Sequence, residues 1–79
     1  MATILFLGRL RESVGAGALT VTLPAGVRDT ERLRDWLAAE HPALREPSVR
    51  IAVNAELHPR QTPLDDGDEI AFLPPVSGG

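Results

Sequence analysis

The chain contains no cysteine, and this absence constrains how its 79 residues can fold. Domains of this size lie near the small end of what folds alone, and many of them depend on disulfides or metal sites. Disulfides, thiolate metal sites and a cysteine nucleophile are all excluded here. Hydrophobic residues make up 43% of the chain, an ordinary proportion for a globular domain. The sequence therefore predicts one domain over residues 1–79, held together by its apolar core alone.

Apolar periodicity predicts several short strands. They are expected over residues 3–7, 19–23, 49–53, 57–58 and 69–73. The first is apolar almost throughout and ends at Gly8, which predicts a central strand buried on both faces. The last strand is followed by Pro74 and Pro75, which cannot donate ladder hydrogen bonds. We therefore expect the sheet to end there and residues 74–79 to form a tail.

One main helix is expected between the second and third strands, after a single helical turn over residues 10–14. Asp29 or Thr30 can cap its first turn, and Pro42 disfavours helical geometry at the residue before it. Its apolar side is expected to consist of Leu33, Trp36 and Leu37. Trp36 is therefore expected in the core. This order of elements predicts an α+β domain with one helix packed across a mixed sheet.

Composition argues against two classes of function. The net charge is −3, and the eight basic residues are all arginines scattered along the chain, which disfavours nucleic-acid binding. No apolar run approaches the roughly 18 residues that a membrane span requires. The first residues show no positively charged segment before an apolar stretch, so no signal peptide is predicted. The expected location is the cytoplasm.

The spacing of acidic and histidine residues does not indicate a metal site. The candidate side chains are Asp65, Asp66, Asp68, Glu69, His41 and His58. The four acids lack the spacing of a calcium loop, and the two histidines lie far apart in the sequence. We expect a solvated turn and surface histidines, with no metal and no cofactor bound by this chain alone.

The end of the sequence is the best candidate for a functional site. Gly78 and Gly79 have no Cβ atoms, so they fit a narrow channel. The four residues from Val76 onward span about 13–14 Å when extended. This pattern suggests an arm that delivers the Gly79 carboxylate into another protein's active site, although a frayed polar tail is the alternative. Leu73, together with the residues that follow it, is expected to form an apolar docking strip.

Residues 66–79, DGDEIAFLPPVSGG, resemble the C-terminal signature of the small subunit of molybdopterin synthase. Residues 4–12, Ala52-Val53-Asn54 and Pro63-Leu64 also fit that family, so the resemblance covers essentially the whole chain. It implies a β-grasp, ubiquitin-like fold in which the first and last strands pair at the centre of the sheet. Leu73 stands where an aromatic residue is frequent in the family.

The resemblance also implies a sulfur carrier. In that role, an ATP-dependent activating enzyme of the ubiquitin-activating type adenylates Gly79, and sulfur replaces AMP to give a thiocarboxylate. The tail then enters the large subunit and donates sulfur to cyclic pyranopterin monophosphate, within a heterotetramer of two small and two large subunits. The residues expected to contact partners are Leu73, Pro74, Pro75, Val76, Ser77 and Gly78. The chain supplies no acid, base or metal, so it is not expected to be catalytic alone.

Two alternatives remain open from the sequence. Related carriers that serve thiamine, transfer-RNA thiolation or cysteine synthesis share the Gly-Gly end. A ubiquitin-like protein modifier would also use it, by joining the end of the chain to lysines of other proteins. Because this chain has no lysine, it cannot form polymers through its own side chains as ubiquitin does.

Overall fold

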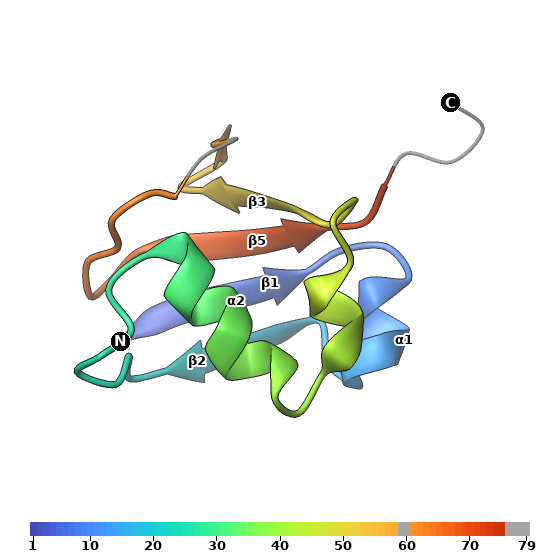
Figure 1. Cartoon of the computed structure of the whole chain (residues 1–79), viewed down its shortest axis with the longest axis horizontal. Coiled ribbons are helices and arrows are strands. Elements are labelled where there is room, and N and C mark those ends of the chain that lie inside the picture. The colour runs from blue at the N-terminus through green and yellow to red at the C-terminus, as the bar shows by residue number, and fades with distance from the viewer. Residues whose placement is uncertain (59–60, 76–79) are drawn as a thin grey trace.

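The computed structural model describes residues 1–58 and 61–75, which form a five-stranded sheet with helices (Figure 1). The strands are β1 (Ala2–Phe6), β2 (Ala18–Val21), β3 (Arg50–Val53), β4 (Glu56–Leu57) and β5 (Glu69–Leu73). Their order across the sheet is β2-β1-β5-β3-β4. β1 and β5 are parallel, while β1–β2, β3–β5 and β3–β4 are antiparallel. The first and last strands thus lie side by side inside the sheet.

The helical elements are α1 (Leu10–Val14), α2 (Thr30–Ala38) and the 3₁₀ turn η1 (Pro42–Arg45). α2 lies across one face of the sheet (Figure 1). Asp29 is the N-cap of α2, and its side chain accepts a hydrogen bond of 2.8 Å from the Arg32 backbone N–H. This N-cap satisfies one of the backbone donors left free in a first helical turn.

The core lies between α2 and one face of the sheet. Ile4, Phe6, Ile70 and Phe72 alternate along β1 and β5, and each is 0% exposed. The rings of Phe6 and Phe72 stack with centroids 5.8 Å apart. Leu33 of α2 completes this contact layer and is also 0% exposed. This arrangement of a mixed sheet, a central parallel strand pair and one crossing helix is the β-grasp, ubiquitin-like fold, as expected.

Three local expectations are wrong. The first strand is central but is not buried on both faces, because Leu5 is only half-buried and Leu7 is 40% exposed. Trp36 is not a core residue: it is 39% exposed on α2. The helix ends at Ala38, two residues before the expected end near Glu40, and η1 follows it with Leu44 fully buried. The first two errors share a cause, since apolar side chains also occupy positions that no other element covers.

Candidate functional site

The segment expected to contact partners begins where β5 ends. Leu73 is the last residue of β5, and Pro74 and Pro75 follow it outside the ladder. All three are half-buried, so each keeps part of its apolar surface accessible. Val76, Ser77, Gly78 and Gly79, which complete the predicted site, lie outside the described residues. The structure therefore describes the first three residues of that site.

Gly8 lies in close contact with the side chain of Pro74. Its φ of +55° lies in the left-handed region that favours glycine. A Cβ added to Gly8 would lie 2.9 Å from Cγ of Pro74, closer than such contacts normally come. Gly8, Arg9, Pro74 and Pro75 together line a shallow cavity of about 290 Å³. The loop after β1 thus contacts the start of the tail, which the sequence pattern did not reveal.

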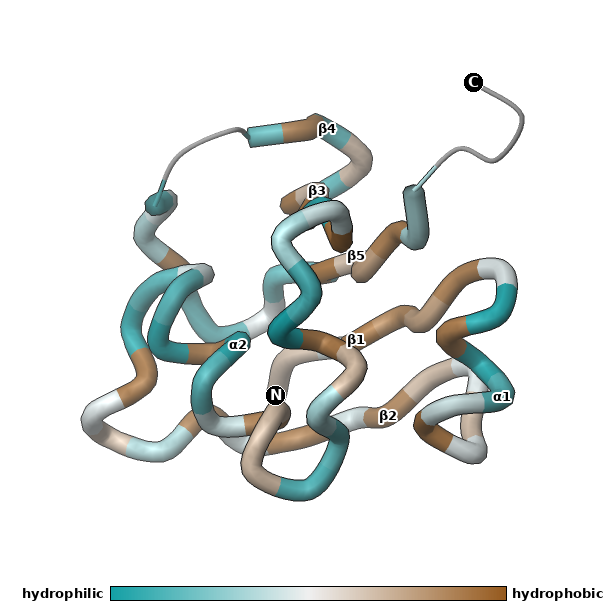
Figure 2. The backbone as a smooth tube through the Cα atoms, turned by 45° about the vertical axis from the view of Figure 1, so that its right-hand side comes forward, coloured by the Kyte–Doolittle hydropathy of each residue, from teal (hydrophilic) through white to brown (hydrophobic). Residues whose placement is uncertain are grey.

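The sheet face opposite α2 is largely apolar and is not covered by a helix. Strand register aligns five side-chain positions across it: Ala18, Leu5, Ala71, Ala52 and Leu57. Leu57 is 50% exposed. Hydrophobic residues along β1 and β5 appear as brown segments in Figure 2. We call the positions Thr3, Leu5, Ala18, Thr20, Arg50, Ala52, Leu57, Glu69, Ala71 and Leu73 the open face.

The open face runs directly into the tail. Leu73 belongs to it, since Leu73 alternates with the buried Phe72 on β5. Leu7 follows β1 and donates its backbone N–H to the Phe72 carbonyl at 3.1 Å, which places it beside the end of β5. An exposed apolar surface of this kind typically marks a protein-binding site. The predicted docking strip is therefore one edge of a larger apolar surface that includes Leu5, Leu7 and Leu57.

The acidic turn is organised by hydrogen bonds within the chain. Asn54 starts the β3–β4 turn with a positive φ of 50°, and its Nδ2 donates to Asp68 at 3.1 Å. The other carboxylate oxygen of Asp68 accepts the Asp65 backbone N–H at 2.8 Å. In the part of the chain that the structure describes, no three acidic or histidine side chains group together to hold a metal ion.

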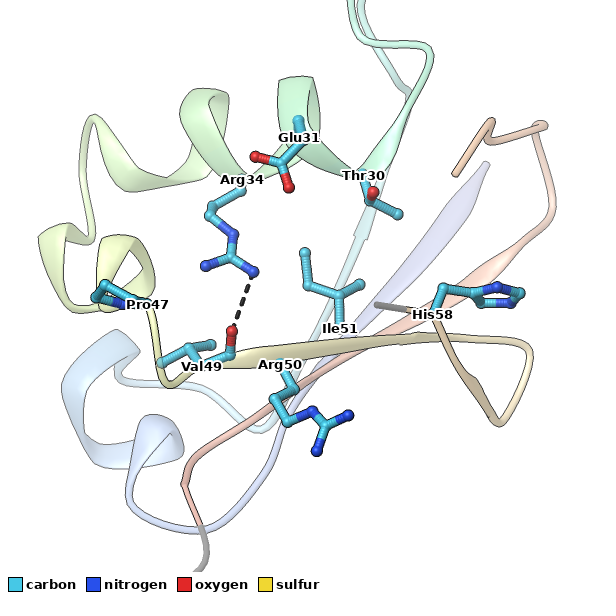
Figure 3. Close-up of a pocket in the computed structure, with 8 residues that line it drawn as sticks. All are labelled: Thr30, Glu31, Arg34, Pro47, Val49, Arg50, Ile51 and His58. Carbon is cyan, nitrogen blue, oxygen red and sulfur yellow. Dashed lines mark hydrogen bonds between the residues drawn. The ribbon is translucent and has the colours of Figure 1, made fainter. Parts of the chain in front are cut away.

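A cavity of about 340 Å³ lies between α2 and β3, and its lining includes Arg50 of the open face (Figure 3). Arg34 of α2 lines it and donates to the backbone carbonyls of Val49 at 3.0 Å and Glu46 at 3.4 Å. These bonds tie the segment before β3 to the helix, which gives Arg34 a structural role. His58 lies at the other side of this cavity, away from the arginine (Figure 3).

These features define the class of protein. It is a ubiquitin-like β-grasp domain in which the last strand, β5, lies inside the sheet and leads into Pro74 and Pro75 beside the open face. The chain belongs to the ThiS family, whose model matches residues 4–79. None of the described helices has the length and hydropathy needed to cross a membrane.

Comparison with individual proteins shows which relatives the chain resembles. The chain is 41% identical over 83 residues to the molybdopterin synthase sulfur carrier subunit of Escherichia coli, covering 100% of both chains. Among solved structures, it is similar to a chain in the complex of subunits 1 and 2 of the molybdopterin-converting factor from Helicobacter pylori. That match has a TM-score of 0.67 and 31% identity, and it covers 99% of this chain and 97% of the other. It is also similar to SAMP1 from Haloferax volcanii, with a TM-score of 0.78, 26% identity and coverage of 99% and 98%.

Proposed function

We propose that this chain is the sulfur carrier subunit of a molybdopterin synthase. The observation that favours this function most is the exit of β5 through Leu73 into Pro74-Pro75 at the edge of the open face. This geometry suits a carrier that docks through a folded surface and extends its end into a partner. The similarity to the Escherichia coli carrier over the full length of both chains supports the same assignment.

The proposed chemistry uses only the Gly79 carboxylate of this chain. A carboxylate is a poor electrophile, so a partner enzyme transfers AMP from ATP to it and releases pyrophosphate. Sulfur from a donor then displaces AMP, and the resulting thiocarboxylate places a nucleophilic sulfur at the end of the tail. That sulfur attacks cyclic pyranopterin monophosphate within the synthase, and water then cleaves the acyl carbon–sulfur bond, which leaves the sulfur on the pterin and returns Gly79 as a carboxylate. The acid, base and metal groups for these steps come from the partners, and no cofactor is held by this chain.

The proposed docking partner is the large subunit of the synthase, in a heterotetramer with two copies of each subunit in the cytoplasm. The open face and the stem at Leu73, Pro74 and Pro75 form its binding surface on this chain, and Val76, Ser77 and Gly78 lead Gly79 into its active site. The Helicobacter pylori structure, in which subunits 1 and 2 form a complex, supports a partner of this kind. The ATP-dependent activating enzyme is the second proposed partner.

Removal of Gly79 tests the proposed chemistry. We expect the shortened chain to keep its unfolding midpoint, since all described core residues lie before Pro74, and to lose sulfur transfer completely. Intact mass after incubation with ATP, the activating enzyme and a sulfur donor is the direct measurement. The full chain should gain the difference between one sulfur and one oxygen atom, located at Gly79. A shortened chain that still transfers sulfur would contradict the proposal.

A protein modifier is the second candidate, favoured by the structural similarity to SAMP1, the small archaeal modifier protein 1. It predicts that this chain becomes attached to lysines of many other proteins. Immunoblots of a strain that produces a tagged chain distinguish the two functions, because conjugates appear as a ladder only if modification occurs. A carrier for another sulfur pathway is distinguished by its partner, since stable copurification with a thiazole synthase would favour thiamine synthesis.

A further inference from the structure

Arg50 is the one basic residue of the open face. It is the first residue of β3 and lies directly across from Leu73 in the antiparallel pair with β5. Its side chain points to the opposite side of β3 from Ile51, whose side chain enters the core (Figure 3). Arg50 therefore stands on the open face beside the last strand residue before the tail.

The guanidinium group of Arg50 has no partner among the described residues, and its side chain is exposed. Arg34 donates to two carbonyls, and Arg45 forms an ion pair with Asp35 at 3.1 Å. Arg50 differs from the other described arginines that form no side-chain hydrogen bond or ion pair, Arg9, Arg11, Arg28 and Arg32, in its place on the open face. The acidic residue of the open face, Glu69, lies four positions before Leu73 on β5, about 13 Å away along the strand. The charge of Arg50 is thus uncompensated on this face.

A partner that covers the open face must supply a group that pairs with this charge. Burying an ionised group without a hydrogen-bonded partner is strongly unfavourable, and arginine matches a carboxylate through two parallel hydrogen bonds. Arginine is also enriched among the residues that dominate binding at interfaces. Because Arg50 lies next to Leu73, the matching group must sit beside the entrance through which the tail passes.

We propose that Arg50 is a specificity-determining contact, and that the large subunit presents a carboxylate to it at the entrance of its tail-binding channel. This inference rests on the proposed function, because it takes the large subunit as the protein that covers the open face. The net charge of the chain is −3, so the attraction is local and does not reflect a generally basic surface. The pair would fix the orientation of the carrier as its tail enters.

Binding kinetics of the unloaded carrier with the purified large subunit test the pairing. We expect Arg50→Gln to weaken the complex at least about tenfold and Arg50→Glu to weaken it further, with a loss that shrinks as salt is added. Arg50→Lys should fall between wild type and Arg50→Gln, because lysine cannot form the bidentate pair. Arg32→Glu on α2, in the layer across the sheet, is the matched control with the same change in net charge, and should bind like wild type.

A second measurement locates the partner group. Each exposed carboxylate near the channel entrance of the large subunit is replaced by lysine, and one replacement should restore binding of Arg50→Glu. If wild type binds but Arg50→Glu binds equally well, the pairing is wrong and the proposed function stands. If wild type does not bind the large subunit at all, both proposals are overturned. Urea unfolding of each variant verifies that the fold is intact.

Discussion

The two faces of the sheet use similar side chains for different purposes. On the face under α2, Ile4, Phe6 and Phe72 are 0% exposed and stabilise the fold. On the open face, Leu5 and Leu73 are half-buried, although they belong to the same two strands. The first set contributes to stability by leaving water during folding. The second set keeps apolar surface in water, which indicates that it is available for burial against another protein.

The strongest test of this difference compares two neighbours on β1. Ile4→Ala should lower the free energy of unfolding by about 2–5 kcal/mol, because it removes buried methyl groups and leaves a cavity. Leu5→Ala removes a side chain of the same atomic composition from the open face, and should cost about 1 kcal/mol or less. Urea unfolding followed by tryptophan fluorescence measures both. Equal losses would show that the open face also stabilises the fold and would break the comparison.

The second test asks what the open face binds. Leu57→Asp should weaken binding to the large subunit by at least about tenfold, because it puts a charge into the apolar surface of the proposed contact. Trp36→Asp is the matched control. Trp36 is also an exposed apolar residue, 39% exposed against 50% for Leu57, but it lies on α2. Titration calorimetry of both variants checks this. If Trp36→Asp weakened binding as much as Leu57→Asp, the partner would contact the helical layer instead.

The sequence predicted the covered face better than the open one. The alternation of Ile70 and Phe72 predicts which residues share a face, and the cap at Asp29 marks the start of α2. Neither pattern tells which face a helix covers, so the first strand and Trp36 were misplaced. The open face depends on register between strands far apart in the sequence, which brings Leu57 into one row with Leu5. A single sequence holds no local signal of that register.

The same limit applies to the candidate site. The tail was found because two prolines and two glycines are local signals that stand out in one stretch of sequence. Gly8 and Arg50 were not found, because each lies more than 20 residues from the tail along the chain and meets it only through pairing with β5. Local chemistry thus pointed to the proposed reactive end, and tertiary pairing pointed to the surface proposed to guide it.

The smallest expected effect is the contribution of Asp29 to the stability of the fold. It depends on pH and concerns the side of the sheet that α2 covers. The Arg32 backbone N–H that donates to Asp29, together with the Gln61 amide at 2.7 Å, holds the pKa of this carboxyl below its ordinary value of 3.8. A carboxyl whose pKa is lowered by folding stabilises the native state at pH values above its unfolded pKa. That contribution is lost as the pH falls through the folded pKa. Asp29 should therefore stabilise the fold at neutral pH but not in strong acid.

Asp29→Asn removes this charge together with the oxygen that accepts from the Gln61 amide, while asparagine still caps a helix and does not ionise. The melting temperature of wild type should exceed that of Asp29→Asn at pH 7, and the difference should shrink as the pH falls below about 4. Binding to the large subunit at pH 7 should be unchanged, since Asp29 precedes α2 on the covered side of the sheet. A difference in melting temperature that stayed constant down to pH 2 would mean that the carboxylate charge plays no part. A change in binding would mean that the two faces are not independent, because a cap on one side would then alter the surface on the other.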